Sequence, residues 1–91
     1  MAKSRKNSTK QRCIELAGDV DGLLFADGYD NAIIGIGIRN GETIVIYDSR
    51  KVIQILRNRD SMSKDEAEEF YDFNIVGAWV GEQTPVFLTR I

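Results

Sequence analysis

The sequence predicts an α+β fold, in which two or three helices pack on a small antiparallel sheet. Three observations lead to this prediction: a hairpin signal at Asn40-Gly41 between two apolar runs, apolar residues at helical spacing on both sides of it, and short apolar runs near the C-terminus. The length of 91 residues suits one domain. We therefore predict a flexible basic arm over residues 1–9 and a single α+β domain over residues 10–91.

The N-terminal part of the chain is basic and the rest is acidic. Residues 1–12 hold five of the twelve lysines and arginines and none of the fourteen acids. So polar a stretch cannot offset the entropy cost of ordering, which is why the arm is expected to be flexible. Residues 11–18 then predict a short helix, with Cys13, Leu16 and Ala17 on one face and Gly18 as its stop. Residues 19–31 are predicted to be irregular or partly helical and to end in a turn.

The central hairpin is predicted to comprise strands 33–39 and 42–47. Asn40-Gly41 favours a type I′ turn, because both of its central residues need a positive φ. The two-residue loop sets the register, from Arg39 opposite Glu42 to Ile34 opposite Tyr47. One face then holds Ile34, Ile36, Ile38, Thr43, Val45 and Tyr47, and the other holds Ile33, Gly35, Gly37, Ile44 and Ile46. Both faces are largely apolar, so we expect both to be covered.

Two helices and two short strands are predicted after the hairpin. The first helix is capped by Asp48 or Ser49, and its apolar stripe consists of Val52, Ile53 and Leu56. The second begins with a capping box formed by Ser63 and Glu66 and ends at Gly77, with its apolar residues Ala67, Phe70 and Phe73 facing inward. Residues 78–80 and 86–91 are predicted to be strands.

The composition favours a protein without catalytic equipment. The chain has no histidine, which removes the commonest general base and the commonest metal ligand. Its one cysteine, Cys13, cannot form an internal disulfide, which is typical of a reducing compartment such as the cytoplasm. No apolar run approaches the roughly 20 residues that a membrane span needs. We expect no enzyme activity, no cofactor, no metal and no membrane contact.

Gly35 and Gly37 stand inside a strand, where larger residues are usual. The stretch GIGIRNG differs from a dinucleotide-binding fingerprint, whose glycines lie between a strand and a helix. The bare backbone instead predicts a close approach by another body. That body is a helix of the same chain, a partner or second copy, or a small ligand.

Acidic residues gather in two places. Asp19, Asp21, Asp27 and Asp30 do not fit the helix–loop–helix calcium pattern, since Leu24 stands where that pattern needs glycine, so turn formation explains them better. The second predicted helix carries Glu68, Glu69 and Asp72, with Tyr71 within it and Trp79 beyond. These five residues are candidates for contact with a basic partner, because tyrosine and tryptophan are enriched at protein interfaces. A solvated helix face, with Trp79 in the core, is the alternative.

Cations of the arm and of the first helix after the hairpin are candidates for phosphate contacts. They are Lys3, Arg5, Lys6, Lys10, Arg57 and Arg59, with Lys51 beside them. No aromatic residues are interleaved with them, and a solvated helix face also explains the helical cations.

Residues 32–88 resemble a recurrent small protein of tailed bacteriophages. The shared pattern is Y-D-x-x-K-x-I-x-I-L, R-D-x-M, E-A-x-E-F, F-N-x-x-G-A and V-G-E-x-T-P, all present here. The chain departs from it in its long basic arm, in Ser61 where glycine is usual, and in Trp79 where tyrosine is usual. The resemblance implies a virus-encoded protein in the cytoplasm of the host cell. It transfers no functional residue.

The sequence thus favours a non-catalytic phage protein that docks on a host or anti-viral defence protein, with a homodimer as one arrangement. Two alternatives stay open. One is a nucleic-acid accessory protein that uses the basic arm. The other is a homo-oligomer that sequesters a small ligand such as a nucleotide near Gly35 and Gly37.

Overall fold

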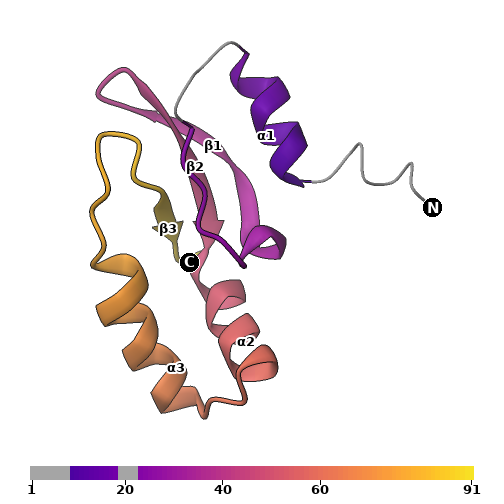
Figure 1. Cartoon of the computed structure of the whole chain (residues 1–91), viewed down its shortest axis with the longest axis vertical. Coiled ribbons are helices and arrows are strands. Elements are labelled where there is room, and N and C mark those ends of the chain that lie inside the picture. The colour runs from indigo at the N-terminus through magenta and orange to yellow at the C-terminus, as the bar shows by residue number, and fades with distance from the viewer. Residues whose placement is uncertain (1–8, 19–22) are drawn as a thin grey trace, which may run out of the picture.

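The structure, a computed structural model, describes residues 9–18 and 23–91. Along the chain come α1 (Thr9–Ala17), a short 3₁₀ turn η2 (Asp30–Ala32), β1 (Ile33–Arg39), β2 (Glu42–Asp48), α2 (Ser49–Arg59), α3 (Lys64–Phe70), the π-helical segment η3 (Tyr71–Val76) and β3 (Val86–Leu88). Figure 1 shows the hairpin at the top, with α2 and α3 as a pair below it. The fold is α+β, as predicted.

The N-terminal segment follows the prediction where it is described. The helix α1 ends at Gly18, whose φ of 74° is the left-handed conformation that favours glycine. The predicted arm lies outside the described residues except for Thr9, with which α1 begins. Residues 23–29 have no regular structure and contain a turn, as predicted, whereas residues 19–22 lie outside the described part.

The hairpin forms around Asn40 and Gly41, whose φ angles of 53° and 81° confirm the predicted turn. The predicted register holds from Arg39 opposite Glu42 to Gly35 opposite Ile46. Beyond that point the prediction is wrong, because Tyr47 lies opposite Ile33 and not Ile34. Ile34 is an extra residue in β1, which makes a β-bulge.

The bulge exchanges the predicted faces of two isoleucines. Ile33 shares the face of Val45 and Tyr47 and is buried, whereas Ile34 is 39% exposed. A single inserted residue reverses the alternation of side chains on one strand, because strand side chains repeat every two residues. The sequence could not reveal the bulge, since both positions hold isoleucine.

The third strand corrects the prediction of an all-antiparallel sheet. The order is β1-β2-β3, and β3 runs parallel to β2 with Ile46 opposite Val86. A parallel neighbour needs a long crossover connection, which α2, α3 and η3 supply. Residues 78–80 are not a strand; they belong to a loop in which the Thr84 hydroxyl accepts from the Val80 amide and donates to the Gly81 carbonyl.

The helix α2 agrees with its predicted pattern. Asp48 is its N-cap, since its side chain accepts from the amides of Arg50 and Lys51. Val52 and Leu56 are fully buried, and Ile53 is half-buried. The apolar stripe predicted from the sequence is therefore confirmed.

The next helix begins as predicted but buries different residues. The capping box of Ser63 and Glu66 is present, and Ala67 is buried. The helix then widens into η3, so the inward line runs through Ala67, Tyr71 and Ile75, each four residues apart. Phe70 and Phe73, which were predicted to face inward, are 36% and 75% exposed.

A single core joins every helix to one face of the sheet. Its buried residues include Cys13 of α1, Val52 and Leu56 of α2, Ala67 of α3, and Val45 and Tyr47 of β2. Phe87 of β3 stacks on Tyr47, with ring centroids 5.3 Å apart. The other face of the hairpin, with Gly35, Gly37 and Ile46, contributes nothing to this cluster.

The described residues show what lies beside each of the two glycines. A Cβ on Gly37 would lie 2.9 Å from the Cδ1 of Ile46, so the neighbouring strand's own side chain fills that space. At Gly35 no described atom lies within 4 Å of such a Cβ. No atom of a described helix lies within 4 Å of a Cβ added at either glycine.

No helix among residues 9–18 and 23–91 has the length and apolar character that crossing a membrane requires.

Candidate functional site

A groove with a volume of about 560 Å³ lies beside α3. Its apolar part consists of Met62, Phe70 and Phe73, and its acidic part consists of Asp60, Glu66 and Glu69; Ser61 and Asn74 complete the lining. We call it the acidic–aromatic groove. It combines exposed rings with carboxylates, which is the combination that suits a basic side chain with an aliphatic stem.

The α2–α3 connection builds one wall of the groove. Arg59 donates to the Asp60 carboxylate over 3.2 and 3.1 Å and to the Gly28 carbonyl over 2.9 Å. The chain then turns through Ser61, whose φ of 57° is the left-handed conformation. Glycine adopts this conformation without strain, whereas serine adopts it less readily.

The π-helical segment builds the other wall. Because Tyr71 and Ile75 take the inward positions, Phe70 and Phe73 face outward into the groove. Tyr71 packs its ring edge-on against Phe87, with centroids 5.8 Å apart. Segments of this kind inside helices often lie at functional sites, since they turn side chains away from the regular helical positions.

The groove and its surroundings carry unneutralised negative charge. Glu66 is occupied by the capping box, and Glu68 forms a 2.8 Å ion pair with Lys64. Among the described residues, Asp65, Glu69 and Asp72 have no hydrogen bond or ion pair to a protein group. Three carboxylates are thus available to an incoming cation.

The sequence-predicted contact residues are only partly brought together. Glu69 lines the groove, whereas Glu68 and Asp72 lie beside Arg50 in a neighbouring hollow. Tyr71 was predicted at an edge, but it is only 9% exposed, and burial raises the pKa of its hydroxyl. It supports the groove from inside.

Trp79 lies on the surface and not in the core. It is 63% exposed, and the Arg39 guanidinium carbon lies 5.3 Å from the centre of its ring. Arg39 also donates to the carbonyls of Glu82 and Thr84, so it holds the loop that carries Trp79 against the hairpin tip. The residue is positioned for contact but does not line the groove.

The predicted phosphate contacts divide into three groups. Arg59 and Lys10 are already engaged: Arg59 with Asp60, Gly28 and Tyr29, and Lys10 with Asp30 over 3.9 Å. Lys3, Arg5 and Lys6 lie outside the described residues. Arg57 is exposed and lines a hollow with Lys51 and Arg50, a residue the sequence did not single out.

The described residues show no metal centre. Among residues 9–18 and 23–91, no three of the side chains His, Cys, Asp and Glu gather closely enough to hold an ion. The two glycines line none of the hollows found beside α2, α3 and residues 23–29.

Comparison with protein-family models, with curated proteins and with solved structures finds no match for the chain.

Sequence reasoning missed the two phenylalanines as surface residues. The signal was present in the four-residue spacing of Ala67, Tyr71 and Ile75, which matches the observed inward line. The three-residue spacing of Ala67, Phe70 and Phe73 fits an ordinary α-helix almost as well, so spacing alone could not decide between them.

Proposed function

We propose that this chain is a non-catalytic, virus-encoded binding protein that acts in the host cytoplasm by docking on a host or anti-viral defence protein. The observation that carries the proposal is the acidic–aromatic groove, in which Phe73 is 75% exposed beside unpaired Glu69. An exposed aromatic side chain in a groove is typical of a protein-contact site.

The negative charge of the groove determines which sign of charge a partner's contact surface must carry. Carboxylates at its rim attract a segment rich in lysine or arginine, and they repel acidic surfaces. The stem of a lysine or arginine would pack on Phe70 and Phe73, while its charged end would reach Glu69. The proposed partner therefore presents a basic segment at its contact surface.

The first test uses Phe73→Ser and a matched control, Leu16→Ser. Both positions hold large apolar side chains of similar exposure, 75% and 72%, and Leu16 lies on α1, away from the groove. We expect host proteins captured by the wild-type protein to be retained by Leu16→Ser and lost with Phe73→Ser. For the purified partner, Phe73→Ser should weaken binding by about 30-fold, the effect of losing an aromatic hot spot worth about 2 kcal/mol.

A charge variant makes the same test more specific. Glu69→Gln removes one groove carboxylate, and Glu15→Gln removes one exposed carboxylate from α1. Binding measured by calorimetry at two salt concentrations should weaken several-fold with Glu69→Gln and stay unchanged with Glu15→Gln. Equal effects of the paired variants, or no capture by the wild-type protein, would contradict the proposal.

A further inference from the structure

The outward face of α2 is a second surface with a chemistry of its own. Ser49, Val52 and Leu56 are buried, and the opposite side of the helix presents five exposed polar residues. We call this side the basic helix face; it consists of Arg50, Lys51, Gln54, Arg57 and Asn58. At about 100° per residue, Gln54 and Asn58 lie at its centre, with Arg50 and Arg57 on one flank and Lys51 on the other.

This face differs from an ordinary solvated helix face. Surface helices usually mix both signs of charge and form pairs four residues apart, as Lys64 and Glu68 do on α3. The helix α2 contains no acid from Ser49 to Arg59. Among the described residues, Arg50, Lys51 and Arg57 form no side-chain hydrogen bond or ion pair.

Asp48, the acidic residue that caps the N-terminus of α2, is already neutralised. Asp48, which also lines the hollow along this face, accepts from Arg90 over 3.1 Å and from the first amides of the helix. Burial acts to raise the pKa of Asp48, but the hydrogen bonds from Arg90, Lys51 and Arg50 outweigh it and lower the pKa. Glu68 and Asp72 share a hollow with Arg50, and the acidic–aromatic groove adjoins the hollow of the basic helix face at Met62.

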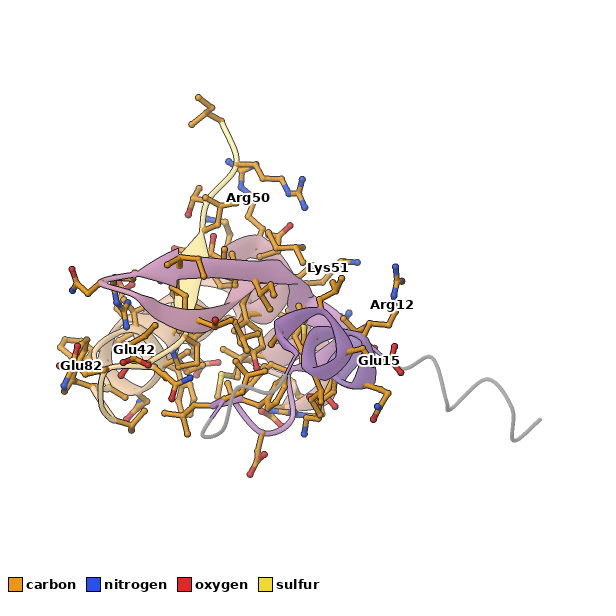
Figure 2. The ribbon with its side chains drawn as sticks, turned by 90° about the horizontal axis from the view of Figure 1, so that it is seen from above. Arg12, Glu15, Glu42, Arg50, Lys51 and Glu82 are labelled. Atoms are coloured by element: carbon orange, nitrogen blue, oxygen red, sulfur yellow. The ribbon has the colours of Figure 1, made fainter. Side chains whose placement is uncertain are left out.

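The face is open to a large partner. A hollow of about 650 Å³ runs along it, and in Figure 1 no described element lies on the outer side of α2. In Figure 2 the charged ends of Arg50, Lys51 and Arg12 lie toward one side of the molecule, with Glu15 below Arg12, whereas Glu42 and Glu82 lie at the far end. The cations of α2 are thus separated from the acidic hairpin tip.

We propose that the basic helix face binds duplex DNA in the major groove. The 11 residues of α2 form a rod about 16 Å long, and the major groove, about 12 Å wide, admits one helix. Arg50, Lys51 and Arg57 contact phosphates on the two sides of the groove, and Gln54 and Asn58 meet the base edges.

Duplex DNA fits this face better than duplex RNA does. The major groove of an A-form helix is deep and narrow, so the side chains of an α-helix cannot read it. Recognition of single strands relies on aromatic side chains on which bases stack, and the basic helix face has none. The hollow along the basic helix face meets the acidic–aromatic groove at Met62, which lines both. The variants are therefore chosen at residues that line only one of the two hollows: Lys51 and Arg57 for the first, and Phe73 for the second.

The test compares Lys51→Gln with Lys64→Gln in the full chain. Each variant removes one exposed lysine charge, but only Lys51 belongs to the basic helix face. Fluorescence anisotropy with a labelled 20-bp duplex is measured between 50 and 200 mM salt. We expect Lys51→Gln to raise the Kd about three- to ten-fold and to reduce the salt slope by about 0.9. Lys64 is paired with Glu68 and makes no proposed phosphate contact, so we expect Lys64→Gln to leave the salt slope unchanged.

Two further variants and one further probe complete the experiment. Arg57→Gln combined with Lys51→Gln should raise the Kd by more than ten-fold, whereas Phe73→Ser should bind as the wild type does. A duplex RNA of the same sequence should bind more weakly. Three results would overturn the proposal: no binding at 50 mM salt or binding that does not weaken toward 200 mM, equal weakening by both lysine variants, or tighter binding to the RNA duplex than to the DNA duplex.

Discussion

At the scale of single residues, Tyr47 does the most to connect distant parts of the chain. Its side chain is fully buried, stacks on Phe87, and accepts a 2.7 Å hydrogen bond from the Ala26 amide. It therefore fixes the irregular segment before the hairpin onto the core. Burial is the main reason that the pKa of Tyr47 is raised to about 12, from 10.0 for an exposed tyrosine.

The variant Tyr47→Phe measures this connection. It leaves the Ala26 amide without its partner, so we expect the free energy of unfolding at pH 8 to fall by about 1–3 kcal/mol. Urea unfolding followed by circular dichroism gives the value. No loss of stability would mean that water replaces the hydroxyl at Ala26.

The same residue gives a pH dependence whose sign follows from its raised pKa. Above pH 10 the unfolded chain loses the Tyr47 proton while the folded chain keeps it until about pH 12, so wild-type stability falls as the pH rises. The fall is about 1.4 kcal/mol per pH unit for this one group. The stability difference between wild type and Tyr47→Phe should therefore narrow between pH 8 and pH 11; a constant difference would contradict the shift.

At the scale of elements, the hairpin contains glycines in two different roles, one in its turn and one within a strand. Gly41 has a φ of 81°, which its turn requires, whereas Gly35 has an ordinary strand conformation and open space where the methyl group of an alanine would lie. The sequence alone made Gly35 look like a point of close approach. None of the described residues fills that space.

The pair Gly35→Ala and Gly41→Ala tests this distinction by thermal unfolding. Gly35→Ala should leave stability unchanged or raise it by up to about 1 kcal/mol, because alanine loses less backbone entropy. Gly41→Ala should lower it by about 1–2 kcal/mol, the cost of a left-handed alanine. A marked loss with Gly35→Ala would show that something in solution fills the space above β1.

Prediction from sequence succeeded where local chemistry decides the structure. The Asn40-Gly41 turn, the Asp48 cap and the Ser63–Glu66 capping box each depend on a few adjacent residues, and all three are present. The bulge at Ile34 and the parallel β3 were missed, because both depend on how distant segments meet. The aromatic residues of the candidate groove were named as core for the same reason: the tertiary fit of Tyr71, and not local spacing, selects the buried side of η3.

At the scale of the whole molecule, the helices pack on one side of a thin sheet. The core takes Val45 and Tyr47 from that side, and the opposite side presents Gly35, Gly37 and half-buried Ile46. The sequence predicted cover on both faces of the hairpin, with a homodimer as one way to supply it. Ile44, which lies on the opposite side, is already buried within a single chain. A second copy bound there would therefore not be needed to bury Ile44.

Light scattering across a concentration series checks the homodimer. If a second copy covers the Gly35 face, the apparent mass should rise from that of one 10.3 kDa chain toward twice that value as concentration increases. The variant Ile46→Lys places a charge on that face and should keep the mass at one chain. A strictly monomeric wild type at the highest concentration would exclude the homodimer.

The widened turn of η3 also has a consequence for chain length. Each residue added to or removed from a helix turns the residues that follow by about 100° around the helix axis. Deleting a single residue between Ala67 and Val76 would therefore restore a regular α-helix and turn the side chain of Phe73 to a different side of it. A related chain shorter by one residue there would keep its composition yet lose the outward ring. The number of residues in this stretch, together with the burial of Tyr71, therefore determines where Phe73 points.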